Sequence, residues 1–179
     1  MRWNRAFTAN PYPVDEGLGV IWRNFVGAKR TNPAGVGFTP RTTPLNDITP
    51  QLTLGLGGDV MSMFGRPLRF DASVRDFFAP CDHVVLNFEG VITDELQISP
   101  DQKHTPPILD ALREVAEPAR LVLGLSNNHT GDFGEKACRD CVVDLERQGF
   151  KTFGLCETPF IDLGDQLRVV TGTQWSNRE

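Results

Sequence analysis

From residue 51 onward, short apolar runs alternate with longer segments that carry apolar residues at helical spacing. This alternation is the feature that most constrains the fold. A short apolar run bounded by turn residues is typical of a buried strand. Such runs predict strands at residues 52–56, 83–88, 120–125, 150–155 and 167–171.

The segments between these runs predict three helices, at residues 71–78, 106–116 and 134–148. Asp71 is a suitable amino-terminal cap for the first helix. Proline near the start of the second helix fits its first turn, and Gly149 ends the third. Strand–helix alternation of this kind predicts an α/β fold in which a mostly parallel sheet is flanked by helices.

Residues 1–50 differ from the rest because proline and glycine repeatedly interrupt any regular pattern. We expect an irregular amino-terminal arm or linker there, with a short element at residues 18–26. Residues 51–179 then form one domain, a size sufficient for its own core.

The composition excludes several classes of function. The 179 residues carry a net charge of −5, which argues against a sequence-independent grip on nucleic acid or an anionic membrane. No run approaches the roughly 18 apolar residues of a membrane span. The first residues lack the apolar core of an export signal, so a cytoplasmic location is expected.

The four cysteines are expected to remain thiols, since no export signal precedes them. Cys138 and Cys141 have C-x-x-C spacing, but both fall inside the helix predicted at residues 134–148. A zinc cluster that also uses Cys81 and Cys156 is the weaker alternative, because the second C-x-x-C of a strong zinc signature is missing.

Polar side chains follow three of the apolar runs, at the points where strands give way to loops. Asp59 follows the first run, Asn87 and Glu89 close the second, and Asn128 and His129 follow the third. The carboxyl ends of parallel strands lie at one edge of a sheet, where ligand sites form. Carboxylate, amide and imidazole donors gathered there predict a divalent-metal site.

Roles follow from the chemistry of these groups. Glu89 suits a metal ligand or a general base, and His129 a ligand or a proton donor to a leaving group. Asp132 either orients the His129 imidazole or caps the following helix. His104 lies in a polar segment and is expected to be incidental, unless it meets an anionic substrate together with Lys103.

Two other interpretations of the first motif stay open. Gly57 and Gly58 fit a tight turn in which Asp59 caps the next segment. A dinucleotide-binding loop starting at Gly55 is less favoured, because G-x-G-x-x-G needs a glycine where Val60 stands.

Three blocks in this order resemble the motifs of the CapA family. They are Gly58-Asp59-Val60-Met61, Asn87-Phe88-Glu89 and the Ser126-Asn127-Asn128-His129 block with Asp132 and Gly134. That family is associated with capsule and poly-γ-glutamate synthesis and is similar to calcineurin-like metallophosphoesterases. The resemblance implies metal-site residues Asp59, Glu89, Asn128 and His129, supported by Asn87 and Asp132. It also implies a divalent cation (Mn, Fe, Zn or Mg) and half of a metallophosphoesterase α/β sandwich.

Members of that family are usually longer, and a second half supplies further histidines. No histidine follows His129 here. Two hypotheses result. The first is a metal-dependent hydrolase or transferase acting on a small-molecule or polymer substrate. The second is a non-catalytic half-domain that serves as a scaffold, in a homo-oligomer or beside a partner chain that covers an incomplete sheet.

Overall fold

The computed structural model divides the chain into two compact units, residues 1–49 and 50–179. It describes Trp22, Val26 and residues 47, 49–61, 67–96, 101–165 and 167–174. The arm predicted over residues 1–50 and the short element at 18–26 lie almost entirely outside the described residues. The account below concerns the second unit.

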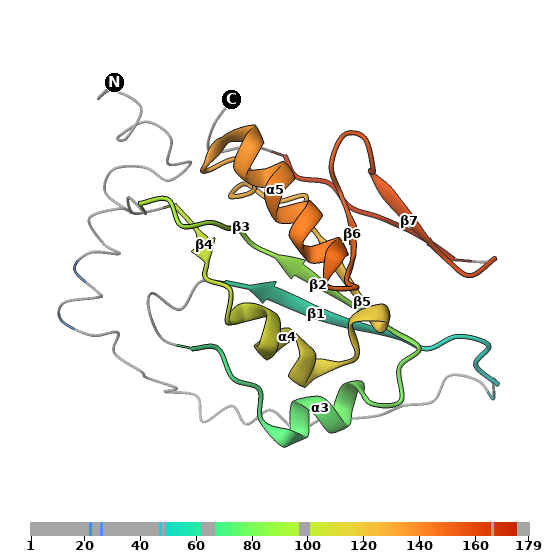
Figure 1. Ribbon diagram of the computed structural model, residues 1–179. Helices are drawn as coiled ribbons and strands as arrows, with labels where there is room; N and C mark the ends of the chain where they lie inside the picture. The colour runs from blue at the N-terminus through green and yellow to red at the C-terminus, as the bar shows by residue number, and fades with distance from the viewer. Residues whose placement is uncertain are drawn as a thin grey trace. The chain divides into compact units, whose positions relative to one another are not determined.

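Four parallel strands form the central sheet, in the order β1-β2-β5-β6 (Figure 1). The fold is therefore α/β with a mostly parallel sheet, as the alternation of segments predicts. The carboxyl ends of the neighbouring strands lie at one edge, because the pairs run in register from Val84 and Leu121 to Asn87 and Gly124. The strands are β1 (Leu54–Val60), β2 (His83–Phe88), β5 (Leu121–Gly124) and β6 (Lys151–Phe153).

The first strand is longer than the sequence predicts. β1 continues past residue 56 to Val60, and its pairing with β2 is irregular between Leu56 and Asp59. Gly57 lies inside this irregular part, where a Cβ atom would come within 2.3 Å of Leu86 Cδ2. The glycines therefore allow close packing within a strand. They do not form the tight turn or the dinucleotide-binding loop that were considered as alternatives.

Three helices cover one face of the sheet: α3 (Ala72–Phe78), α4 (Ile108–Val115) and α5 (Gly134–Arg147) (Figure 1). Asp71 caps α3 as predicted, since its side chain accepts a 2.9 Å hydrogen bond from Ser73 N. The helices bury residues at helical spacing, so each presents one apolar stripe to the sheet. Side chains alternate between the two faces of the sheet along each strand. Those of β2 and β5 that belong to the helix-covered core are Val84, Leu86, Phe88, Leu121 and Leu123.

An antiparallel hairpin covers part of the opposite face, which the sequence did not predict. β7 (Phe160–Leu163) pairs with β8 (Leu167–Val170), and Leu163 packs on Val122 and Phe153 of the central sheet. The segment predicted as a strand at residues 167–171 thus belongs to a separate two-stranded sheet. The connection between β7 and β8 is short, and a parallel pair needs a crossover of a dozen or more residues, so the two strands pair antiparallel.

Two very short strands lie beside the carboxyl edge of the main sheet. β3 (Val91–Ile92) follows β2 directly and pairs in parallel with β4 (Lys103–His104). Their two residues each were too few to give a pattern in the sequence.

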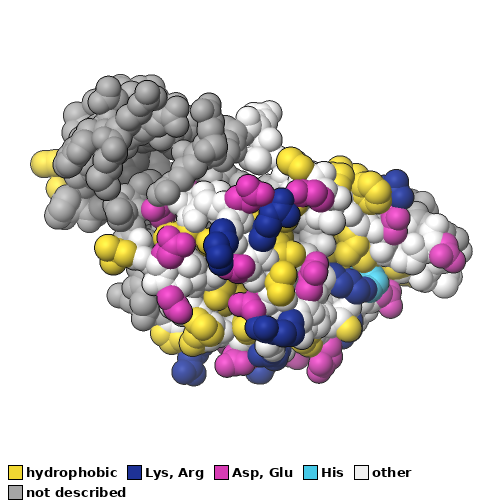
Figure 2. Space-filling model, turned by 45° about the horizontal axis from the view of Figure 1, so that its top comes forward, with side chains coloured by type: hydrophobic (Ala, Val, Ile, Leu, Met, Phe, Trp, Pro, Cys, Tyr) yellow, Lys and Arg dark blue, Asp and Glu magenta, His cyan; other side chains and the backbone are white. Residues whose placement is uncertain are grey.

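Charged side chains of both signs are mixed on the face of the molecule seen in Figure 2. Several pair along α5, including Lys136 with Asp140 and Arg139 with Glu135. Among the helices of the described ranges, none has the length and apolarity needed to cross a membrane.

Arg120 joins the end of α3 to the start of β5. It closes the short 3₁₀ helix Pro118–Arg120, and its guanidinium donates hydrogen bonds to the carbonyl oxygens of Phe78, Ala79 and Cys81. Carbonyl groups at a helix end lack partners within the helix. Arg120 supplies them from a different element.

We therefore expect Arg120→Ala to lower the free energy of unfolding by about 1–3 kcal/mol, because up to three carbonyl groups lose a charged donor. Urea denaturation measures this. Arg147→Ala is the matched control, since Arg147 makes an exposed pair with Asp144 and should change stability by less than about 1 kcal/mol. Equal effects of the two substitutions would contradict the capping role.

Candidate functional site

A chain of side-chain amides connects the three strand ends at the carboxyl edge. Asn87, at the end of β2, donates a 2.7 Å hydrogen bond from Nδ2 to Asp59 Oδ1. Asn127, after β5, donates from its own Nδ2 to Asn87 Oδ1 at 3.2 Å and to the Phe88 carbonyl oxygen at 2.9 Å. The carboxyl ends of β1 and β2 and the loop after β5 are thereby joined directly.

Asn127 also shapes the turn that carries the histidine. Its Oδ1 accepts hydrogen bonds from His129 N and Thr130 Oγ1, each at 3.1 Å. A side chain that bonds to the backbone two residues on stabilises a turn in the way a backbone carbonyl does. Asn128 and His129 are therefore placed by Asn127, and both are partly buried.

Glu89 and His129 lie next to each other in this edge. Glu89 Oε1 is 3.5 Å from His129 Nε2, and Glu89 is 8% exposed. Burial raises the pKa of the Glu89 carboxyl group, and the nearby Asp59 carboxylate adds to this effect, while His129 opposes it. The site thus holds the Glu89 carboxyl group beside the His129 imidazole and near the Asp59 carboxylate, in surroundings that disfavour negative charge on Glu89.

Asp132 lies behind the histidine. It is 1% exposed, and its Oδ2 accepts hydrogen bonds from His129 Nδ1 at 2.6 Å and from Gln102 N at 2.8 Å. Because that oxygen is an acceptor, the Nδ1 atom carries the proton, and Nε2 is the atom directed toward Glu89. Of the two roles considered for Asp132, the structure shows contact with the imidazole. α5 has no side-chain cap.

The structure brings together most of the predicted site. Asp59, Asn87, Glu89, His129 and Asp132 are linked by the contacts above, and Asn128 lies in the same turn as His129. Sequence reasoning did not assign a role to Asn127, although its position directly after a buried strand is a signal for a side-chain turn.

His104 is not exposed to a substrate, contrary to one expectation. It is 4% exposed, and its Nε2 donates to the carbonyl oxygen of Glu89 at 3.0 Å. Lys103 is engaged elsewhere, since its Nζ donates to the Glu95 carbonyl oxygen. The pair therefore does not form an anion-binding surface. The reason is the β3–β4 pairing, which carries His104 into the interior.

The donors have the chemistry of a divalent-cation site. Carboxylate and amide oxygens with one imidazole nitrogen suit Mg, Mn, Fe or Zn. In the described part of the chain, however, no three His, Cys, Asp or Glu side chains are arranged to hold a metal ion. The donor types fit a cation, and the contacts described above are hydrogen bonds among the donors.

The cysteines are free thiols. Cys81, Cys138 and Cys141 are buried and Cys156 is exposed. Burial raises the pKa of Cys141 to about 11, and its Sγ accepts a hydrogen bond from Ile92 N. Because burial stabilises the neutral thiol, Cys141 belongs to the core that holds α5 against β3.

Comparison with known families identifies the chain. Residues 53–160, more than half of its length, match the model of the bacterial capsule synthesis protein family PGA_cap. The chain belongs to this family. The match contains all six predicted site residues. A comparison with curated proteins gave no match.

The electrostatics of this family member's site give a pH prediction. The pKa of Glu89 is higher in the folded protein than the ordinary value of 4.5. The unfolded chain therefore ionises first as the pH rises. In the presence of a chelator, wild-type stability relative to Glu89→Gln should fall as the pH rises above about 4.5 and level off above the folded-state pKa.

Urea unfolding of both proteins from pH 4 to 8 measures this difference. Glu89→Gln keeps the shape of the side chain and removes its charge, so it should be the more stable protein at the upper end. A wild-type protein that gains stability over Glu89→Gln with rising pH would contradict the assigned environment.

Proposed function

We propose that this domain acts in capsule-polymer synthesis as a metal-dependent hydrolase or transferase of the metallophosphatase type. Family membership supports the link with capsule synthesis. The observation that carries the enzymatic part is the position of Glu89 beside His129 at the carboxyl edge of the parallel sheet, with the Asp59 carboxylate near enough to raise the pKa of Glu89. Groups that react are commonly placed at this edge of α/β proteins.

Each residue has a stated task in this proposal. Asp59 and Glu89 supply carboxylate oxygens, Asn128 an amide oxygen, and His129 its Nε2 atom. Asp132 holds the Nδ1 proton of His129, so Nε2 stays directed into the site. Asn87 and Asn127 bond the ends of β1 and β2 to the loop after β5.

A bound divalent cation would act as a Lewis acid and lower the pKa of a water ligand. The chain's own proton chemistry lies with the neighbouring pair. Glu89 has surroundings that raise its pKa toward the range useful for a general base. His129 Nε2 has one of two roles: it binds the cation, or, when it is free of the cation and has taken up a proton, it passes that proton to a leaving group. Phosphate esters and γ-glutamyl-type amides are the substrate classes that this chemistry serves.

Two observations favour a second candidate function, a non-catalytic assembly role. Among the described residues, no three His, Cys, Asp or Glu side chains are arranged to hold a metal ion. In addition, Leu56 of edge strand β1 is 68% exposed. A domain of this kind would use its sheet edge or apolar face to contact another chain.

Metal content separates the two functions. We expect the purified protein, dialysed against Mn²⁺ and then against metal-free buffer, to retain a stoichiometric amount of manganese by elemental analysis. Asp59→Ala and His129→Ala should lose it, because each removes a donor from the site.

His83→Ala is the matched control, since His83 begins the strand whose other end reaches the site. It should retain manganese like the wild type. A folded wild-type protein without metal, or equal loss in His83→Ala, would contradict the enzymatic proposal. Turnover of a generic phosphodiester by a monomer in the presence of Mn²⁺ would contradict the scaffold role.

A further inference from the structure

Gln102, the residue directly before β4, makes an unusually close approach to Gly90, which follows Glu89. Gly90 has φ +98°, and a Cβ atom there would lie 2.4 Å from the Gln102 carbonyl oxygen. Only glycine fits such an approach without displacing backbone. The short β3–β4 pair is thus held tightly against the turn that carries Glu89.

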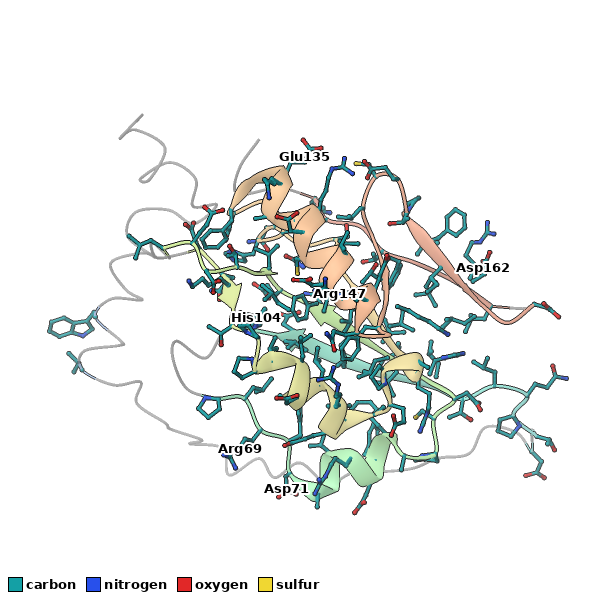
Figure 3. All side chains as sticks on the ribbon, in the orientation of Figure 1. Arg69, Asp71, His104, Glu135, Arg147 and Asp162 are labelled. Atoms are coloured by element: carbon teal, nitrogen blue, oxygen red, sulfur yellow. The ribbon has the colours of Figure 1, made fainter. Side chains whose placement is uncertain are left out.

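His104, two residues after Gln102, bonds to the backbone of Glu89. Its Nε2 donates to the Glu89 carbonyl oxygen at 3.0 Å, and its ring packs on Phe88 with 4.5 Å between ring centroids. The Val60 carbonyl at the end of β1 accepts a hydrogen bond from the Glu89 N–H at 3.1 Å. Figure 3 shows His104 on β4 at the end of β1. Glu89 is therefore held through its backbone N–H by the end of β1 and through its carbonyl oxygen by one buried imidazole.

Gln102 serves the other half of the site from the same segment. Residues two apart on an extended segment share a side, and Gln102 and His104 are both buried. The Gln102 N–H donates to Asp132 Oδ2, the same oxygen that accepts from His129 Nδ1. The segment from Gln102 to His104 therefore bonds to Glu89 directly and to His129 through Asp132.

We propose that His104 is a positioning residue, which fixes the Glu89 turn through its carbonyl oxygen and so sets the place of the Glu89 carboxyl group beside His129. The effect of this positioning on metal binding rests on the proposed function. The hydrogen bond from His104 to the Glu89 carbonyl oxygen does not, and so the bond and the metal binding are tested separately.

Two variants separate positioning from packing. His104→Phe keeps a ring against Phe88 and removes the donor. His104→Gln loses the ring and keeps an N–H donor at a similar reach. If His104 serves only the core, Phe should behave like the wild type and Gln should not. If His104 positions Glu89, then His104→Gln should behave like the wild type in the properties of the site, and His104→Phe should not.

The first measurement uses the full chain without metal. The ¹³C resonance of the Glu89 carbonyl, recorded by NMR with chelator present, reports its hydrogen bond. We expect this resonance to shift in His104→Phe and to return toward the wild-type position in His104→Gln. In the wild type alone, the ¹⁵N resonance of His104 Nε2 should be that of a protonated ring nitrogen, a result that requires no variant to fold.

The second measurement is the affinity for Mn²⁺ by calorimetry. Loss of a group that orients a ligand typically weakens metal binding 10- to 100-fold, so we expect about a 10-fold loss in His104→Phe. His104→Gln should stay within about 3-fold of the wild type even though its melting temperature falls.

Each outcome has a defined meaning. An unchanged carbonyl resonance in His104→Phe, an unprotonated Nε2 in the wild type, or undiminished Mn²⁺ affinity in His104→Phe would overturn the positioning role. If the wild type binds no Mn²⁺ but the carbonyl resonance moves in His104→Phe and recovers in His104→Gln, positioning stands and the proposed function fails.

Discussion

The hydrogen-bonded amides of Asn87 and Asn127 are the interaction on which the site depends. Asn127 donates to Asn87, and Asn87 donates to Asp59. These hydrogen bonds connect three strand ends. The direction of donation is fixed, because Asp59 accepts and the Phe88 carbonyl also accepts. Neutral amides achieve this link without adding charge beside two carboxyl groups. Any cation would therefore meet carboxylates whose spacing the protein itself determines.

A second layer supports this link from the side of the core. The helices α3, α4 and α5 bury one face of the sheet, and the β3–β4 pair lies beside its carboxyl edge. From this segment, His104 Nε2 donates a hydrogen bond to the Glu89 carbonyl oxygen, and the Gln102 N–H donates one to Asp132. The Gln102 N–H and His104 Nε2 donors are both bonded, and an arrangement that broke either bond would leave a buried donor without a partner. The candidate site residues Glu89 and Asp132 are therefore bonded to a short segment that lies beside the apolar core.

Much of this arrangement was predictable from local pattern. The helix cap at Asp71, the strand 83–88 and the position of Asp59, Glu89 and His129 at strand ends follow from residue spacing. The hairpin β7–β8 was not predicted as such, because its pairing depends on a short connection whose geometry a strand pattern does not reveal. The burial of His104 depends on a close backbone approach at Gly90, which only the folded chain shows. Asn127 was missed because an asparagine that holds a turn and one that binds a ligand look alike in sequence.

The central proposal is that the carboxyl ends of β1, β2 and β5 and the residues that follow them bring their donors to one shared point. Anomalous diffraction from a crystal of the full chain soaked in Mn²⁺ tests this most directly. The account predicts one strong manganese peak at the carboxyl edge, within bonding distance of Asp59, Glu89 and the Asn128–His129 turn. A well-ordered crystal with no peak at this edge, or with manganese bound only at other surfaces, would contradict it.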